Sequence, residues 1–474
     1  MKRFVSFVLA AVLTLLACSL LFSCKSDIAD FEPEPFDTEK PVTITFYHTM
    51  GAVGRDVLDK YIKKFHEMYP NITVEHKSQG DYAGLKSTIN TELINNDEPD
   101  IAYCYADHVA LYNLTGKVVP LDSLIAYDVT VKDAGGNESR IGLTDEQKND
   151  FIKAFFEEGS KFEDGKMYML PFSKSTEVLF YNKDFFDANK LSVPTTWDEM
   201  EEVCKKIKED IDPKCIPLGY DSEDNWFITM CAQLGSDYTS LEKGNHFLFD
   251  NETNRNFVKR FNDWYNKGYV ITRQLNNNKY ASSLFTAKGE DTKAYMCIGS
   301  TAGGSYQLGE ATDGVYPFEV GITFIPQADM NNKKVISQGP SVCLFNKGDK
   351  QKVMAAWLFM KYLTTDTTFQ VEFAMKSGGY IPVLNSAKEH TVYKSFLDKA
   401  NGTNFINALA AKACYDQADI AFTSPVFNGS SDAREAVGAL LAKCLTLKPG
   451  ATLDEEIAKT FKDFVEECKY KTGG

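Results

Sequence analysis

The chain has 474 residues and a formal net charge of −15 at pH 7, and 43% of its residues are hydrophobic. This length exceeds one typical domain, so we expect at least two domains with packed cores. The acidic balance argues against nucleic acid or an anionic membrane surface as a partner.

The first 24 residues have the pattern of a secretory signal. Lys2-Arg3 precedes a mostly apolar run over residues 4–22, and Cys24 follows that run. The ending resembles the bacterial lipoprotein pattern, so we expect residues 1–23 to be removed and Cys24 to be lipidated. Cys18 also fits this pattern, although the apolar run continues beyond it, and a cleaved signal without lipid is a further alternative. No later stretch approaches the ~20 apolar residues of a membrane span.

Residues 24–40 are predicted to form an extended acidic tether. Six acids and two prolines fall between Lys25 and Lys40, with few large apolar side chains. Such a segment cannot bury a core, and it reaches at most ~50 Å. Nine cysteines remain after Cys24. No Cys-x-x-Cys occurs, so we expect no metal site and no cofactor, and any disulfide, such as Cys204 with Cys215, is left open.

Residues 42–104 predict a βαβαβ unit, and therefore an α/β fold with a parallel sheet. The expected strands are 42–47, 72–75 and 100–104, and the helices lie between them. In such sheets ligands bind beyond the carboxyl ends of the strands. This rule places His48, Tyr82 and Asp107 at one rim. A single histidine after a strand is more often structural, and Asp107 could equally be an exposed acid or a helix cap.

The stretch Met169–Phe186 is central to the chain. Its middle, Val178–Tyr181, predicts a buried strand. Ser173–Thr176, which includes Ser175, supplies polar groups where the chain enters that strand. A few polar groups on an apolar wall are typical of a small-ligand cleft, but ordinary strand entries have this pattern too.

Two Gly-containing segments follow. Gly299–Gly304, which includes Gly303, is a small-residue loop after a predicted strand, where backbone N–H groups can approach a ligand. It lacks the lysine and the spacing of a nucleotide-binding loop. Gly378-Gly379 precedes Tyr380, so this turn presents one aromatic side chain.

The order of several motifs resembles family 1 extracellular solute-binding proteins of ABC importers, which include maltose- and glycerol-3-phosphate-binding proteins. The likeness covers about residue 42 to the C-terminus. The motifs are Ile44–His48, Asn182-Lys183-Asp184, Pro194-x-Thr196-Trp197, Ala356-Trp357-x-Phe359 and Gly379–Val383.

The resemblance implies a two-lobe periplasmic-binding-protein-like fold (class II type), in which a hinge joins the lobes and solute binds in the cleft between them. We expect residues 41–172 in lobe one, 173–319 in lobe two, 320–365 back in lobe one, and 366–474 in lobe two. The protein would act as a monomer that closes on solute and delivers it to the permease subunits of the transporter.

The glycerol-3-phosphate-binding members are the most similar in motif, through Leu170–Leu179 and Gly80-Asp81-Tyr82. Position by position, the resemblance places Tyr82, Ser175, Gly303 and Tyr380 on ligand contacts. In those members, a late segment of the chain supplies an arginine to the phosphate. The matching segment here, residues 422–428, has no basic residue. Its Phe427 would instead offer a surface to a neutral sugar.

A mono- or oligosaccharide is therefore the expected solute. Sugars have apolar faces and a rim of hydroxyls, so their sites need flat aromatics and fixed polar groups. Trp226 and Tyr380 are the stacking candidates, with core packing as the alternative for Trp226. Asp107 could accept two sugar hydroxyls.

Other functions remain open at this point. A glycerophosphodiester, glycerol-3-phosphate or a polyamine could replace the sugar. A secreted glycoside hydrolase would need paired carboxylates, and none stands in a recognisable catalytic setting. A surface lipoprotein without a small ligand is the remaining alternative. We expect a binding protein rather than an enzyme, outside the cytoplasm and anchored by lipid.

Overall fold

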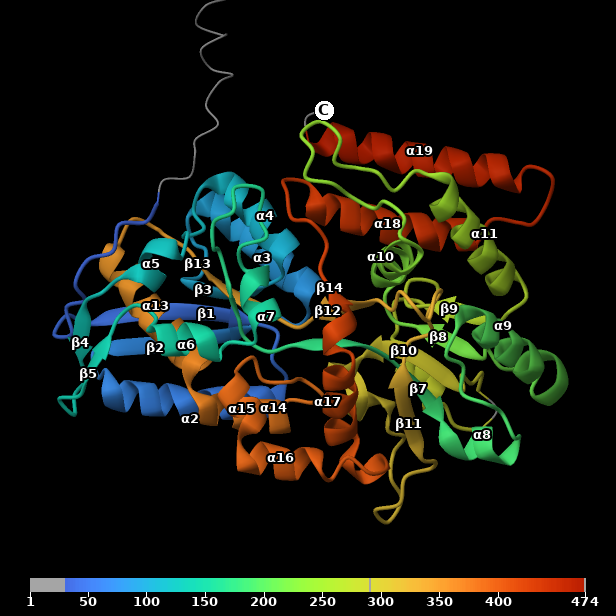
Figure 1. The fold of residues 1–474 in the computed structure, drawn as a ribbon, viewed down its shortest axis with the longest axis horizontal. Coiled ribbons are helices and arrows are strands. Elements are labelled where there is room, and N and C mark those ends of the chain that lie inside the picture. The colour runs from blue at the N-terminus through green and yellow to red at the C-terminus, as the bar shows by residue number, and fades with distance from the viewer. Residues whose placement is uncertain (1–29, 290, 473–474) are drawn as a thin grey trace, which may run out of the picture.

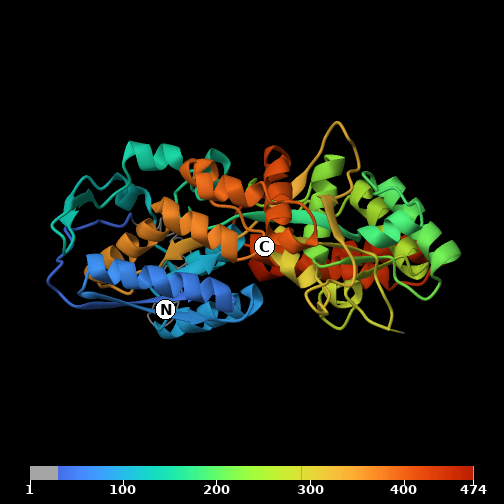
Figure 2. The ribbon, with the colours of Figure 1, turned by 90° about the horizontal axis from the view of Figure 1, so that it is seen from below.

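The computed structural model describes residues 30–289 and 291–472. The chain forms two lobes side by side, each built on its own β-sheet (Figure 1). A view from below also separates the blue and orange first lobe from the green second lobe (Figure 2). The expected two-lobe α/β fold is confirmed.

The first lobe contains a five-stranded sheet in the order β2-β1-β3-β13-β6. Its strands are β1 (Val42–His48), β2 (Ile72–Ser78), β3 (Ile101–Cys104), β6 (Leu170–Pro171) and β13 (Ser341–Leu344). β1 pairs in parallel with β2 and β3, whereas β13 runs antiparallel to β3. Alternation along β1 buries Ile44, Phe46 and His48, because successive side chains point to opposite faces.

Helices cover both faces of this sheet. They are α2 (Ala52–Met68), α3 (Tyr82–Asn95), α4 (Ala106–Tyr112), α5 (Asp122–Ala126), α6 (Asp145–Asp150), α7 (Lys153–Glu158), α13 (Lys350–Thr365), α14 (Thr367–Lys376), α15 (Asn385–Glu389) and α16 (Thr391–Leu397), with a 3-10 turn η1 (Asn113–Thr115) and a small hairpin of β4 (Thr130–Lys132) and β5 (Glu138–Arg140). In the core, the ring centroid of Phe46 lies 6.4 Å from that of Phe172 and 6.3 Å from that of Phe359.

The second lobe contains a seven-stranded sheet. Its strands are β7 (Ser175–Asn182), β8 (Leu218–Tyr220), β9 (Val270–Thr272), β10 (Met296–Ser300), β11 (Val320–Phe324), β12 (Val335–Gln338) and β14 (Ala421–Phe422). β7 is the predicted central strand, and it pairs antiparallel with β10, β11 and β12. β8, β9 and β10 are parallel.

The helices of this lobe are α8 (Lys183–Ala188), α9 (Trp197–Lys206), α10 (Glu223–Leu234), α11 (Glu252–Asn266), α12 (Ser282–Phe285), α17 (Ile406–Asp416), α18 (Ser430–Leu445) and α19 (Leu453–Thr472), with the short helices η2 (Ile207–Ile211), η3 (Thr301–Gln307), η4 (Thr403–Phe405) and η5 (Ala418–Ile420). α10, α18 and α19 stack at the upper right of Figure 1. Their apolar residues join one buried cluster with α9 and α11.

Two chain crossings between the lobes run side by side. One leads from β6 to β7 through residues 172–174, and the other leads from β12 to β13 through Gly339-Pro340. The backbone N–H groups of Phe172 and Ser173 both donate to the Pro340 carbonyl, at 3.1 and 3.2 Å. Gly339 has φ +95°, and a Cβ there would lie 2.4 Å from the Ser173 carbonyl oxygen, so only glycine fits. These paired segments form the hinge region.

The expected lobe boundaries need correction at two places. β11 and β12 pair with β7 in the second sheet, so the return crossing lies at Gly339-Pro340 rather than at residue 320. Residues 366–397 do not belong to the second lobe, because Phe369, Phe373 and Tyr393 pack in the core of the first. We therefore propose that the first lobe comprises about residues 30–172 and 340–400.

The expected tether is also wrong over residues 30–40, which lie against the first lobe. Phe31 and Phe36 are buried, with 6% and 9% exposure. The Ser123 hydroxyl donates to the Phe31 carbonyl at 2.5 Å. The Gln351 amide donates to the Pro35 carbonyl at 3.0 Å. We call residues 30–40 the strap. The two buried phenylalanines anchor the strap, while most of its other residues stay exposed.

The predicted signal peptide, Cys18 and Cys24 lie outside the described residues. Within the described part of the chain, no helix is long and apolar enough to cross a membrane. All nine cysteines after Cys24 are free and buried. Over the same residues, no group of three or more His, Cys, Asp and Glu side chains could hold a metal ion.

Candidate solute site

A hollow of about 410 Å³ lies between the lobes, and we call it the larger hollow. It lies beyond the carboxyl ends of β1 and β3, where ligands bind in such sheets. The first lobe and the crossings contribute Thr49–Gly54, Tyr103, Pro340, Phe373, Lys376, Ser377, Gly378 and Tyr380, and the second lobe contributes Ala302, Ser305, Tyr306 and Asn407.

Tyrosines concentrate at this place. The rings of Tyr82 and Tyr105 are 4.7 Å apart at 51°. Burial and the nearby Tyr380 raise the pKa of Tyr82 well above its ordinary value, and the same two causes raise that of Tyr103. The hydroxyl of Tyr103 is buried without a hydrogen-bond partner in the structure. Such a group is costly to bury, so it is a natural partner for a polar solute.

A second space, the smaller hollow, is lined by Tyr105 and measures about 60 Å³. Its charged lining residues are Asp107, Glu158 and Arg434. Arg434 comes from α18, and its Nε lies 2.7 Å from Asp224 Oδ2. Glu158 lies 2.6 Å from Lys174 Nζ, in an ion pair at the hinge.

A buried carboxyl group lies behind Arg434. The Arg434 Nη2 donates to Asn225 Oδ1, and the Asn225 amide donates to Glu177 Oε1 at 3.0 Å. The Tyr220 hydroxyl donates to Glu177 Oε2 at 2.7 Å. Burial raises the pKa of Glu177 to about 8, although both hydrogen bonds lower it. The network therefore links the start of β7 to α10 and α18.

The structure brings three predicted residues to the cleft. Tyr380 lines the larger hollow, and Tyr82 is its neighbour. Asp107 lines the smaller hollow and is half-buried. Gly303 lies in η3 beside lining residues, and a Cβ there would meet open space. Ser175 is 4% exposed and accepts a hydrogen bond from the Ser300 hydroxyl at 3.2 Å, so it joins β7 to β10.

His48 is at the expected strand end, but its side chain is fully buried. The Met50 N–H donates to His48 Nδ1 at 3.1 Å, so in the neutral ring the proton lies on Nε2. Nε2 is 2.8 Å from His76 Nδ1 and donates to it. Burial, His76 and Arg55 lower the pKa of His48 to about 3. His48 is therefore a structural histidine rather than a rim residue.

Trp226 and Phe427 do not provide stacking surfaces for a sugar. Trp226 is fully buried, with its ring stacked on Tyr220 at 4.8 Å and 4.1 Å from Phe261. Phe427 is 2% exposed and stacks on His246 at 4.5 Å. Both complete the second core, because a large ring gains more from full burial than from a wet cleft.

The sequence reasoning missed Arg434. The expected arginine was sought in the segment 422–428, whereas Arg434 reaches the cleft from the first turns of the following helix. Tyr105 directly follows β3, so the rule that selected Asp107 also places Tyr105 at this rim.

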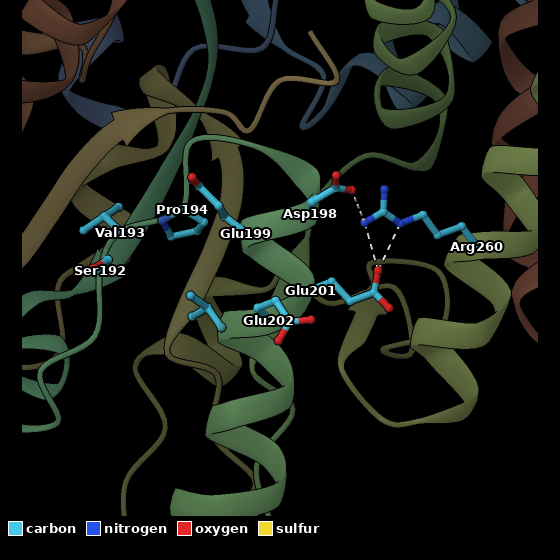
Figure 3. A pocket seen from close by; sticks show the side chains of 9 residues that line it. Ser192, Val193, Pro194, Asp198, Glu199, Glu201, Glu202 and Arg260 are labelled. Carbon is cyan, nitrogen blue, oxygen red and sulfur yellow. Dashed lines mark hydrogen bonds and ion pairs between the residues drawn. The ribbon is translucent and has the colours of Figure 1, made fainter. Parts of the chain in front are cut away.

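The hollow in Figure 3 lies elsewhere, on the outer surface of the second lobe, and measures about 560 Å³. It is formed by the loop before α9, α9 itself and Arg260 from α11. Arg260 Nη2 lies 2.7 Å from Asp198 and 2.9 Å from Glu201. Neither the hinge nor the first lobe contributes residues to this hollow, so lobe closure does not form it.

Comparison with known proteins defines the class. The model of the bacterial extracellular solute-binding protein family matches residues 60–400, so the chain belongs to this family. It is the solute-binding protein of an ABC importer.

The particular relatives are binding proteins for small solutes. The chain is 24% identical over 379 residues to the sn-glycerol-3-phosphate-binding periplasmic protein of Salmonella typhimurium, covering 76% of this chain and 79% of that protein. It is 25% identical over 375 residues to its Escherichia coli K12 counterpart, with the same coverage.

Solved structures share the fold. The GacH receptor of Streptomyces glaucescens, determined unliganded and with acarbose, has a TM-score of 0.69 at 18% identity, covering 90% of this chain and 98% of that one. The UgpB protein of Mycobacterium tuberculosis with glycerophosphocholine has a TM-score of 0.70, also at 18% identity and with the same coverage. Maltotriose-bound MalE of Bdellovibrio bacteriovorus has a TM-score of 0.65 at 19% identity, covering 90% and 99%.

Proposed function

We propose that this protein captures a neutral mono- or oligosaccharide between its lobes and delivers it to an ABC permease. The observation that carries the proposal is the buried, unpartnered Tyr103 hydroxyl in the larger hollow, beside Tyr82 and Tyr380. Tyrosines offer both a ring face for the apolar side of a sugar and a hydroxyl for its rim. Several solved relatives in fold were determined with sugars.

The rest of the proposal concerns how the protein works. It binds and releases its solute without chemical change, and the relatives are binding proteins rather than enzymes. Solute contacts both lobes and therefore favours the closed state. The protein acts as a monomer outside the cytoplasm, and lipid on Cys24 holds it at the membrane near the permease.

A phosphorylated solute is the second candidate. Arg434 lies at the smaller hollow, and the curated relatives carry glycerol-3-phosphate in their names. An arginine can hold a phosphate through two parallel N–H donors. Glycerol-3-phosphate and glycerophosphodiesters therefore belong in the binding test.

The test is a thermal-shift screen of the purified protein against sugars, glycerol-3-phosphate, glycerophosphocholine and polyamines. A solute that binds only the native state raises Tm by mass action. We expect a shift with a sugar that is lost in Tyr380→Ala and kept in the control Tyr470→Ala, which alters a tyrosine that is 89% exposed. A shift with phosphorylated solutes alone would contradict the proposal. Release of reducing ends from a glycan would favour the alternative function, a secreted glycoside hydrolase.

A further inference from the structure

We infer that the cleft is built to reject phosphorylated solutes, because Asp224 and Asp107 already balance the charge of Arg434. The inference rests on the proposed binding site and names the class of solute that this site takes: an uncharged polyhydroxylated molecule. Arg434 then acts as a specificity-determining donor to neutral oxygen atoms.

The arginine is fixed in place. Its Nε lies 2.7 Å from Asp224 Oδ2, and its Nη2 donates to Asn225 Oδ1. The Ser222 hydroxyl donates to Asp224 Oδ1 at 2.5 Å, which holds that carboxylate at the start of α10. α10 and α18 also approach closely here, since a Cβ on Gly438 would lie 3.3 Å from Asp224 Cβ. Two nitrogen groups of the guanidinium, Nε and Nη2, are therefore already bonded to the protein when a solute arrives.

Asp107 adds a second negative charge from the opposite lobe. It lines the smaller hollow together with Arg434, and its attraction contributes to the raised pKa of that arginine. A hydroxyl placed between them can accept from the guanidinium and donate to the carboxylate. A phosphate oxygen can only accept, so it would face the Asp107 carboxylate with like charge.

Two other cations at the hollows also lie beside carboxylates. Lys376, which lines the larger hollow, lies 2.9 Å from Glu372, which Lys60 shares at 2.6 Å. Lys174 is paired with Glu158 at 2.6 Å. Lys161 donates to Thr423 at the edge of the smaller hollow, but it is exposed, where salt screens its field. The lining of the smaller hollow therefore offers no uncompensated positive charge to repay the desolvation of a phosphate.

The experiment removes the carboxylate charges and keeps the shape of the side chains. Glycerol-3-phosphate and glycerophosphocholine are titrated at low salt into the wild type, Asp107→Asn and the double variant with Asp224→Asn. The matched control is Asp198→Asn, which removes the same charge beside Arg260, 2.7 Å away, in the outer hollow of Figure 3. Circular dichroism checks that every variant is folded.

We expect affinity for glycerol-3-phosphate to rise about tenfold or more in the double variant, less in Asp107→Asn and not in Asp198→Asn. Unchanged phosphate affinity in the two cleft variants would overturn the inference, and so would a wild type that binds glycerol-3-phosphate more tightly than any sugar. A different result would contradict the proposed function, namely the absence of sugar binding to the wild type. The present test instead compares the affinity for phosphorylated solutes between variants.

Discussion

At the scale of single residues, the cleft differs from the core in how its polar groups are satisfied. Most buried polar atoms in a folded protein have a partner. At the cleft, the hydroxyl of Tyr103 has none, whereas buried Glu177 receives two side-chain hydrogen bonds. The Tyr103 hydroxyl is suited to contact solute, and the Glu177 carboxyl group is suited to hold the protein scaffold.

The first prediction concerns Tyr103. Tyr103→Phe should weaken sugar binding by about 1 kcal/mol, because a solute loses one hydrogen bond. Protein stability should stay the same or rise, since an unpartnered buried hydroxyl is removed. Calorimetric titration with the best sugar from the screen measures the first effect, and denaturant unfolding measures the second. Equal affinity in variant and wild type would show that the hydroxyl does not meet solute.

The second prediction concerns the pH dependence of stability. The pKa of Glu177 is about 8 in the folded protein against an ordinary value of 4.5, so folding takes up a proton between these values. The contribution of this group to stability is therefore fully present below pH 4.5 and is lost as the pH rises towards 8.

Glu177→Gln mimics the protonated group and should flatten this dependence. At pH 9 the variant should be more stable than the wild type by up to a few kcal/mol. Urea unfolding between pH 5 and 9 measures the difference, with exposed Glu146→Gln as the control. A variant with the same pH profile as the wild type would mean that Glu177 is ionised when folded.

At the scale of elements, the hinge combines close backbone contact with a buried ion pair. Lys174 is 1% exposed at its side chain and lies beside the paired crossings, with its backbone N–H on the Ile381 carbonyl. Its ammonium group depends on Glu158, because no solvent reaches it.

The third prediction follows from that burial. Glu158→Gln should destabilise the protein by about 3–5 kcal/mol, since it leaves a buried ammonium group without a counter-charge. The double variant Lys174→Met with Glu158→Leu should recover most of the loss. Asp463→Asn removes an exposed ion pair with Lys459 as a control and should cost less than about 1 kcal/mol. Guanidinium unfolding distinguishes these outcomes, and a small effect of Glu158→Gln would mean that water reaches the hinge.

Elements with a strong local pattern could be predicted from sequence. The alternation in residues 42–47 and the apolar run 178–181 gave the right strands. The first pattern has one buried face, and the second is typical of a strand buried on both faces. The lobe boundaries after residue 319 could not be found this way. β11 and β12 are short, and which sheet they join depends on pairing with β7, far away in sequence.

The candidate site was predictable only in part, for a related reason. Tyr82, Asp107 and Tyr380 follow strands or tight turns, so topology alone brings them to the rim. Trp226 and Arg434 lie on helices, where the direction of a side chain depends on how α10 and α18 pack. That packing is a tertiary property, and no local pattern specifies which face turns to the cleft.

At the scale of the whole molecule, ion pairs join the lobes across the cleft. Lys86 on α3 pairs with Glu435 on α18 and donates to Ser431. Arg273 of the second lobe lies 3.8 Å from Asp81 of the first. These contacts exist only when the lobes are close together, so they favour the closed state before solute adds its own contacts.

The fourth prediction tests this arrangement. Lys86→Glu places like charges together at Glu435 and should shift the solute-free protein towards an open form, with a larger radius of gyration by small-angle scattering. Apparent solute affinity should fall in proportion, because less of the protein is competent to bind. The charge swap Lys86→Glu with Glu435→Lys should restore both. No change in scattering would show that the pair does not affect closure.

The strap has a consequence for how the protein meets its permease. Residues 30–40 are held on the first lobe, so if Cys24 carries the proposed lipid, residues 25–29 would span at most about 20 Å between it and the folded body. Under that proposal, so short a segment would confine the receptor to a thin layer above the bilayer and raise its local concentration at the transporter. The first lobe would then move little relative to the membrane, and opening would be chiefly a swing of the second.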